Sequence, residues 1–144
     1  MTGAQARQRF AAARVARLST VDSSGQPHLV PIVFALVRLT IYTAVDAKPK
    51  RGKGLRRLAN IAANPRVSVL VDHYDEDWTE LWWVRADGTA RVLPVTEPEG
   101  RAAIDALVQR YPQYRDQPPP GPVIAIHVDR WSYWAARPVP PATR

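Results

Sequence analysis

Cysteine is absent from the 144-residue sequence, which excludes disulfides, thiolate metal sites and cysteine nucleophiles. Long apolar runs are also absent, since no stretch approaches the roughly 18 residues that suggest a membrane-spanning helix. Residues 1–14 lack the apolar core of a signal peptide, and no internal repeat divides the chain. The sequence therefore predicts one soluble, cytoplasmic domain over residues 1–144, with no membrane partner.

The motifs of common catalytic and metal sites are missing as well. Neither G-x-S-x-G nor H-E-x-x-H occurs, and the glycines near residue 52 fit neither the phosphate-loop nor the Rossmann pattern. His28, His73 and His127 lie far apart, and the possible acidic co-ligands of His73 are Asp75 and Asp77. We therefore expect no bound metal, and no motif identifies a catalytic residue.

Positive charge, in contrast, is abundant and unevenly distributed. The chain has 20 Lys and Arg against 13 Asp and Glu, a net charge of +7, which favours an anionic partner. Up to Val71 there are twelve basic residues and two acidic ones, whereas residues 72–80 carry five acids and no Lys or Arg. The basic excess therefore belongs to the first half of the chain.

Six of the ten residues from Lys48 to Arg57 are cationic, and they lead into a helical pattern over residues 54–63 that ends before Pro65. The predicted buried stripe of this helix consists of Leu55, Leu58, Ala59 and Ala62. One interpretation of the cations is a solvated helix face. The other is an anion site, because cations at a helix N-terminus oppose the macrodipole unless an anion binds there. Nucleic acid is disfavoured as that anion, since all five tryptophans lie beyond the basic run and no recognised binding motif is present.

The first part of the chain predicts a helix followed by antiparallel strands. Thr2 and Gln5 form a capping box before a short helix whose apolar side carries Phe10. Strand patterns fall at residues 14–21, 27–37 and 39–45. The first two form a hairpin, and the second is a long buried strand in which Pro31 marks a bulge or an edge. A tight turn near Arg38 leads into the third.

The second part predicts more strands and one further helix. Strand patterns fall at residues 66–72, 81–86, 89–95, 123–128 and 131–136. Asp87 and Gly88 are typical of a type I′ hairpin turn. Thr96 and Glu99 form a second capping box, before a helix whose apolar positions are Ile104, Leu107, Val108 and Tyr111. Residues 111–122 are a proline-rich connector. About seven strands and three short peripheral helices indicate a mainly β (α+β) antiparallel barrel.

Residues 25–72 resemble the flavin-binding core of the pyridoxamine 5′-phosphate oxidase-like split β-barrel family. The matching elements are the G-x-P strand from Gly25, the Tyr42–Thr43 pair, the Lys/Arg loop, and the N-P-R-V-S run from Asn64 to Ser68. The close match covers about a third of the chain, and the order of elements extends it further. The resemblance implies an antiparallel split β-barrel of the FMN-binding type. It also implies a homodimer with a flavin-like cofactor in the groove between subunits.

The same resemblance implies a set of cofactor-binding residues. These are Val30, Pro31, Ile32, Val33, Tyr42, Thr43, Lys48, Lys50, Arg51 and Lys53. The backbone of the strand from Val30 to Val33 would lie along the ring system of the cofactor. The hydroxyl of Thr43 and the cations of the loop would hold its phosphate.

One departure from the family pattern bears on the choice of cofactor. FMN-dependent oxidases of the family carry an Arg and a Lys on the second strand, near the positions of Val30 and Ala35 here. The strand, the loop and the acidic stretch instead resemble the branch that uses the deazaflavin coenzyme F420. This branch implies an oxidoreductase that reduces a small organic substrate by hydride transfer. Tyr42, His73 and water are candidates for a proton donor, and a structural role is the favoured alternative for the two side chains. The alternatives are an FMN-dependent oxidase or reductase of the same fold and a non-catalytic F420 carrier.

The tryptophans give a reason from the residues themselves to expect a partner subunit. They are Trp78, Trp82, Trp83, Trp131 and Trp134. Trp82 and Trp83 point to opposite faces of their strand, so that one is a core residue and the other requires a cover. Because aromatic residues are enriched in interface cores, a second copy of the chain is the expected cover.

Overall fold

The computed structural model describes residues 1–45 and 53–140. Within them the elements follow the order α1 (Gly3–Ala12), β1 (Ala16–Val21), β2 (Pro27–Ile32), β3 (Ala35–Val37), β4 (Thr40–Ala44), α2 (Lys53–Ala63), β5 (Arg66–His73), η1 (Trp78–Glu80), β6 (Trp82–Leu93), α3 (Pro98–Arg110), α4 (Pro112–Asp116) and β7 (Val123–Ala135). The predicted loop cations Lys48, Lys50 and Arg51 lie outside the described residues. None of the described helices is long and apolar enough to cross a membrane.

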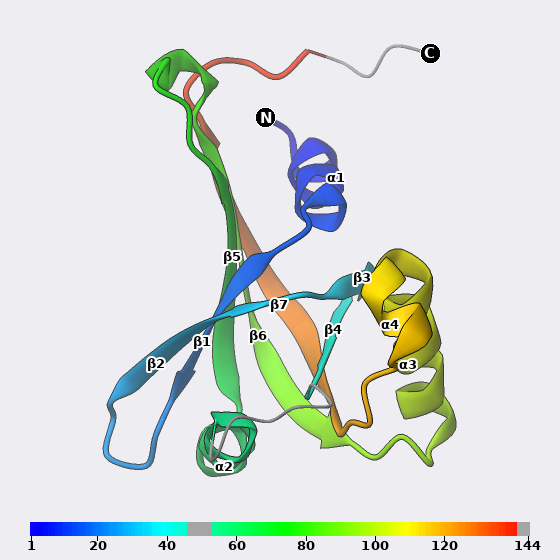
Figure 1. Cartoon of the computed structure of the whole chain (residues 1–144). Helices are drawn as coiled ribbons and strands as arrows, with labels where there is room; N and C mark the ends of the chain where they lie inside the picture. The colour runs from blue at the N-terminus through cyan, green and yellow to red at the C-terminus, as the bar shows by residue number, and fades with distance from the viewer. Residues whose placement is uncertain (46–52, 141–144) are drawn as a thin grey trace.

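The described strands form one seven-stranded antiparallel sheet in the order β2-β1-β5-β6-β7-β4-β3. The long strands β5, β6 and β7 form its centre, and the sheet curls around a core that α1 covers from one side (Figure 1). Helices α3 and α4 pack beside β3 and β4 over a second, smaller core. The predicted mainly β fold, an antiparallel split barrel with peripheral helices, is confirmed.

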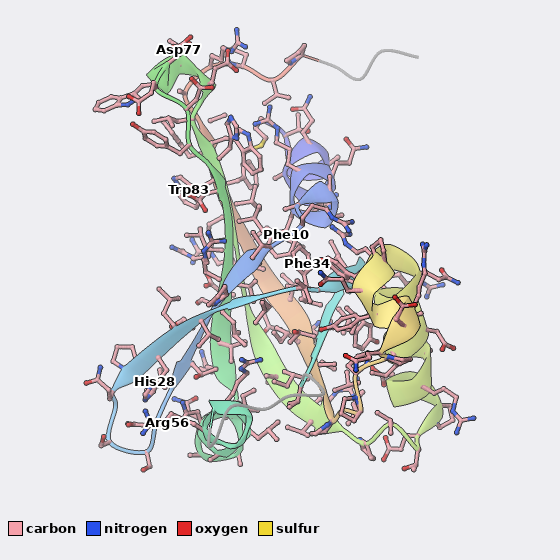
Figure 2. All side chains as sticks on the ribbon, in the orientation of Figure 1. Phe10, His28, Phe34, Arg56, Asp77 and Trp83 are labelled. Atoms are coloured by element: carbon pink, nitrogen blue, oxygen red, sulfur yellow. The ribbon has the colours of Figure 1, made fainter. Side chains whose placement is uncertain are left out.

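Strands β2 and β3 are consecutive in the chain but lie at opposite edges of the sheet. Val33 and Phe34 join them and cross the open side of the curled sheet. We call these two residues the β2–β3 crossing. The Phe34 ring is fully buried, with its centroid 5.1 Å from that of Phe10 on α1 (Figure 2). The predicted single buried strand over residues 27–37 is therefore wrong. It is two strands, and β2 is a mostly exposed edge strand, as Pro31 indicates.

The Asp87–Gly88 pair does not form the predicted hairpin. It lies inside β6, which pairs with β5 on one side and β7 on the other, and the register with β7 shifts at this pair. A Cβ atom at Gly88 would lie 2.2 Å from the His127 carbonyl oxygen. Glycine is therefore present because the two backbones approach closely at a β-bulge. The two strands predicted at residues 123–128 and 131–136 likewise form one strand, β7, which ends at Ala135.

The first predicted capping box is confirmed, and the second is wrong. Gln5 N donates to Thr2 Oγ1 at 3.1 Å, and Thr2 N donates to Gln5 Oε1 at 2.9 Å. Helix α3 begins after Glu97 without a side-chain cap, because the Glu99 carboxylate accepts hydrogen bonds from Tyr42 and Arg91 instead.

The predicted buried stripe of α2 is shifted around the helix. Ala59 and Ala62 are exposed, whereas Asn60 and Ile61 are buried and Leu58 is half-buried. The shift follows from a hydrogen bond of 3.0 Å that the amide of Asn60 donates to Thr20 Oγ1 on β1. In the predicted proline-rich connector, residues 112–116 form the short helix α4, and residues 117–122 are irregular.

Candidate functional site

The backbone of the β2–β3 crossing lies between two strands, outside any strand ladder, and side chains supply its hydrogen-bond partners. Thr43 Oγ1 on β4 donates to the Val33 carbonyl oxygen at 2.9 Å. Phe34 N donates to Tyr111 Oη at 3.1 Å. The single hydroxyl proton of Tyr111 can reach the carbonyl oxygen of Phe34 or that of Arg14, each 3.0 Å away. Buried backbone groups need partners, so these two side chains hold the crossing in place.

The predicted ring-contacting residues belong to β2 and the first position of the crossing. Val30 and Ile32 turn toward the core, where Ile32 is buried and Val30 packs against the main cluster. The Pro31 side chain points the other way and is exposed. Since β2 pairs only with β1 among the described strands, its other edge presents backbone groups that the sheet leaves unpaired. The cofactor ring that the resemblance implies would therefore lie along an edge strand of the described sheet.

Tyr42 and Thr43 are adjacent on β4, and both make hydrogen bonds within the protein. The Thr43 side chain is buried, and its only hydroxyl proton goes to the Val33 carbonyl. A phosphate dianion offers acceptors only, so this hydroxyl cannot also donate to a phosphate in the same rotamer. Tyr42 Oη donates to Glu99 Oε2 at 2.9 Å.

The electrostatics of the Tyr42–Glu99 pair keep the phenol protonated. Burial raises the pKa of Tyr42, and the hydrogen bond to the Glu99 carboxylate raises it further. The pKa of Glu99 is lowered, first by the hydrogen bond from Arg91 and then by the one from Tyr42. As the phenol is already a donor to a carboxylate, Tyr42 in this arrangement tethers β4 to the start of α3.

Of the predicted cations, Lys53 is the first residue of α2, and the loop members before it lie outside the described range. The first turn of α2 contains no acidic side chain. Free backbone N–H groups at a helix start favour an anion, and an acidic side chain there would compete for them. The Asn60 bond to Thr20 and the burial of Ile61 dock this helix against β1 and the core.

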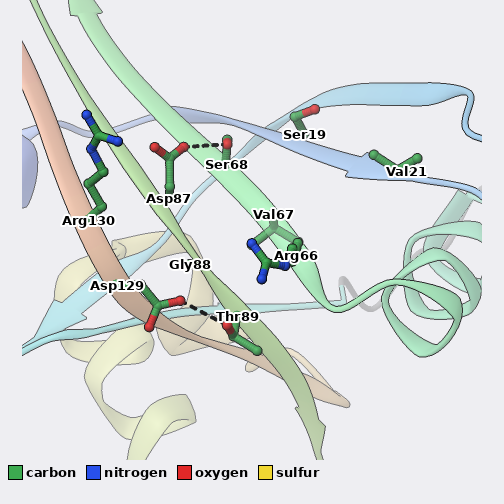
Figure 3. A pocket seen from close by; sticks show the side chains of 10 residues that line it. All are labelled: Ser19, Val21, Arg66, Val67, Ser68, Asp87, Gly88, Thr89, Asp129 and Arg130. Carbon is green, nitrogen blue, oxygen red and sulfur yellow. Dashed lines mark hydrogen bonds between the residues drawn. The ribbon is translucent and has the colours of Figure 1, made fainter.

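The face of the sheet opposite α1, which we call the outer face, was not visible as a site in the sequence. It carries two adjacent clefts. The smaller, of 460 Å³, is lined by Arg17, Ser19, Leu29, Ser68, Leu70, Asp72, Trp83 and Arg85. The larger, of 690 Å³, is lined by Ser19, Val21, Arg66, Val67, Ser68, Asp87, Gly88, Thr89, Asp129 and Arg130 (Figure 3). Alternation along β5 and β6 could have assigned these side chains to one face, but the false hairpin at Asp87 obscured the register.

Both aspartates of the larger cleft are held by hydroxyl groups. Ser68 Oγ donates to Asp87 Oδ1 at 2.6 Å, and Thr89 Oγ1 donates to Asp129 Oδ2 at 2.9 Å (Figure 3). Asp87 also forms an ion pair with Arg85 across 3.2 Å. The outer face therefore carries both positively and negatively charged side chains close together.

The tryptophans follow the predicted alternation. Trp82 packs against the core, where the Arg9 guanidinium lies 4.8 Å from its ring centroid, whereas Trp83 lines the smaller outer-face cleft (Figure 2). Trp134, opposite Trp83 on β7, is 46% exposed. Trp78, in the β5–β6 connection, is 68% exposed.

Each histidine has a local contact of its own. The His73 ring stacks on Trp82 with centroids 6.1 Å apart, and His28 Nε2 lies 3.7 Å from Asp22. His127 is mostly exposed beside Asp129. Within residues 1–45 and 53–140, no three His, Asp or Glu side chains gather as a metal site would require.

Comparison with known proteins identifies a family and several similar folds. The family model described as pyridoxamine 5′-phosphate oxidase matches residues 2–135. An FAD-binding protein from Mesorhizobium loti is 23% identical, with 92% of this chain and 94% of that chain covered and a TM-score of 0.72. A conserved hypothetical protein from Mycobacterium tuberculosis is 24% identical, with coverage of 95% and 86% and a TM-score of 0.76. The heme storage protein HutZ from Vibrio cholerae is 14% identical, with coverage of 92% and 93% and a TM-score of 0.72. A search of curated proteins gives no match.

Proposed function

The chain belongs to the pyridoxamine 5′-phosphate oxidase family, and from this membership we propose that it binds a flavin-type cofactor and acts as an oxidoreductase on a small organic molecule. The family match over residues 2–135 is the observation that carries the proposal. The similarity to an FAD-binding protein from Mesorhizobium loti supports it at the level of the fold.

The residues present fit such a cofactor at two points. The edge of β2 that pairs with no described strand offers backbone groups to the polar rim of a flavin-like ring, and Pro31 contributes a carbonyl acceptor but no donor. The start of α2, free of acidic side chains, suits a phosphate. The proposed binding residues are Val30, Pro31, Ile32, Val33, Tyr42, Thr43, Lys48, Lys50, Arg51 and Lys53.

When bound, the cofactor supplies the hydride chemistry, and the protein supplies binding, orientation and electrostatics. The β2 edge orients the ring, and the cations at the start of α2 hold its phosphate. Tyr42 and Thr43 act indirectly: the Tyr42 hydroxyl binds Glu99 on α3, and the Thr43 hydroxyl binds the Val33 carbonyl of the β2–β3 crossing. The absence of a catalytic dyad in the sequence is consistent with this division of roles.

For the cofactor itself we favour the deazaflavin coenzyme F420 over FMN. The positions where FMN enzymes of the family carry strand cations are occupied by Val30, half-buried against the core, and Ala35, buried in the smaller core. No phosphate contact comes from these two apolar side chains. The broad cationic run before and within α2 suits a longer anion such as the phosphate and glutamate tail of F420.

We favour a homodimer as the working form, with the outer face as the contact surface. Its two clefts carry four arginines and three aspartates around exposed apolar groups such as Leu29. A two-fold interface places the same patch on both sides, so a patch that carries both charge signs can pair with its own copy. Aromatic residues and arginine are also enriched in interface cores.

Fluorescence titration of the purified protein with F420, FMN, FAD and heme tests the proposal. We expect F420 to bind more tightly than FMN, with an affinity that falls as added salt screens the exposed part of the anion. Tighter binding of FMN would assign the chain to the flavin enzymes, and preferential binding of heme would align it with the heme storage protein. Hydride transfer from reduced F420 to an unsaturated substrate distinguishes an enzyme from a carrier.

A further inference from the structure

Polar backbone groups of the β2–β3 crossing are bound by side chains and not by a neighbouring strand. The crossing closes the barrel between two edge strands, and its two residues lie outside the ladders that hold the rest of the sheet. Three of its backbone polar groups nevertheless have side-chain partners, from Thr43 on β4 and from Tyr111 at the end of α3. These partners are 10 and 77 residues away in the chain from the groups they bind.

Tyr111 is itself fixed on several sides. The Arg14 guanidinium lies 4.5 Å from the centroid of its ring, and Arg14 Nη2 donates to the Arg110 carbonyl at 2.9 Å. The Arg110 guanidinium donates to the carbonyls of Ala11 and Ala13 and lies 5.3 Å from the Phe34 ring centroid. The phenol therefore connects the end of α3, the α1–β1 link and the crossing in one buried unit.

We infer that Thr43 and Tyr111 are positioning residues: they fix the backbone of Val33 and Phe34 and thereby hold the Val30–Val33 stretch along which the cofactor ring lies. The inference rests on the proposed function, because the ring is placed along Val30 to Val33 there. The Thr43 hydroxyl acts on the cofactor through the Val33 carbonyl and makes no contact with the phosphate. Tyr111 acts through Phe34 in the same way, from the C-terminal end of α3.

A positioning role and a phosphate contact differ in their dependence on the phosphate. The test compares each phosphorylated cofactor with its phosphate-free counterpart, namely F420 with its deazaflavin–ribityl fragment and FMN with riboflavin. Thr43→Val is nearly isosteric and removes the hydroxyl. We expect it to weaken binding of both members of a pair by the same factor, about fivefold, the value of one hydrogen bond. Thr43→Ser should restore both.

Tyr111→Phe tests the second residue through a different bond. We expect the same phosphate-independent loss of about fivefold and a shift in the absorbance band of the bound ring. Tyr133→Phe is the matched control, because Tyr133 on β7 is 39% exposed and its hydroxyl makes no hydrogen bond to any described residue. It should leave affinity and spectrum unchanged.

Hydrogen exchange provides a readout in the unliganded protein. The Phe34 amide should exchange slowly in the wild type, since it donates to Tyr111 Oη, and about tenfold or more faster in Tyr111→Phe. A Thr43→Val loss confined to the phosphorylated cofactor would overturn the inference, as would variants that lose stability but keep affinity and spectrum. If the wild type binds none of F420, its deazaflavin–ribityl fragment, FMN and riboflavin, the proposed function is overturned, and the inference with it.

Discussion

Replacement of Gly88 by alanine tests the account of the β6–β7 bulge, on which the shape of the outer face depends. The added Cβ atom would lie 2.2 Å from the His127 carbonyl oxygen and 3.0 Å from a methyl carbon of Ile126, whereas real Cβ contacts below 3.0 Å essentially never occur. The first obstacle is backbone, which cannot rotate away as a side chain can. Strands β6 and β7 must therefore move apart.

The expected loss in the free energy of unfolding follows from how much of the β6–β7 pairing the substitution disturbs. Strands β6 and β7 pair over twelve registered positions, and the bulge lies near the middle of them. Forcing an extra carbon into a packed region costs typically 1–3 kcal/mol, and a backbone obstacle belongs at the upper end, so we expect a loss of about 3 kcal/mol. For a domain of this size that corresponds to a fall in Tm of roughly 10 °C.

Urea unfolding followed by tryptophan fluorescence at one fixed protein concentration measures the loss. Gly3→Ala is the control, since its Cβ would meet only the flexible end of Arg7 at 3.4 Å and the Tyr133 hydroxyl at 3.6 Å. It should change stability by less than about 0.5 kcal/mol or increase it, because alanine is the better helix former. If the two alanine variants unfold at the same urea concentration, the bulge is not constrained as described.

Three further predictions concern charge and association. Lys50→Glu and Lys53→Glu should each weaken F420 binding in a titration by more than about tenfold without loss of fold, whereas Arg101→Glu on the exposed side of α3 should not. If both lysine variants bind F420 normally, the cations from Lys48 to Arg57 are only a solvated helix face and not an anion site. The pKa of Glu99 is lower in the folded protein than its unfolded value near 4.5, so the ionised carboxylate stabilises the fold above pH 4.5 and this stabilisation is lost as the pH falls through the folded pKa. Over that acidic range, the urea midpoint of Glu99→Gln should therefore fall less steeply with decreasing pH than the urea midpoint of the wild type. Sedimentation equilibrium at micromolar concentration should show a dimer that Trp134→Asp dissociates, and a monomeric wild type would refute the interface.

The elements that sequence patterns predicted correctly are those with local causes. The Thr2–Gln5 capping box satisfies helix N–H groups within one turn, and the end of α2 before Pro65 follows from proline geometry. The predicted turn near Arg38 connects the short strands β3 and β4, and the φ angle of Arg38 in it is 56°. Each of these features depends on residues only a few positions apart in the chain, so a local sequence pattern is enough to predict it.

The wrong predictions have distant causes. Asp87 and Gly88 prefer a turn locally, but β5 and β7 pair with both edges of β6 and keep it extended. Glu99 could cap α3, yet Tyr42 and Arg91 from two strands bind its carboxylate instead. Such competition between local preference and tertiary partners cannot be resolved from spacing alone.

The candidate site was predicted unevenly for the same reason. The residues on β2 and β4 could be located from the resemblance, because that segment is continuous in the chain. The outer-face clefts depend on the register of five strands, β1, β2, β5, β6 and β7, and the bulge at Gly88 changes that register. The helical pattern assigns Tyr111 to an apolar face and carries no sign that its hydroxyl meets the backbone of Phe34.

In the proposed site a large planar cofactor lies against β2, an edge strand of the described sheet. An edge strand has ladder hydrogen bonds on one side only, and β2 is an edge strand that ends in a crossing outside the ladder. A rigid ring needs a surface that is already in place, since ordering that surface on binding would reduce affinity. The hydroxyls of Thr43 and Tyr111 supply the restraint from the buried side. On this proposal the unpaired edge of β2 receives the ring, and the cations before and at the start of α2 add affinity without having to define the geometry.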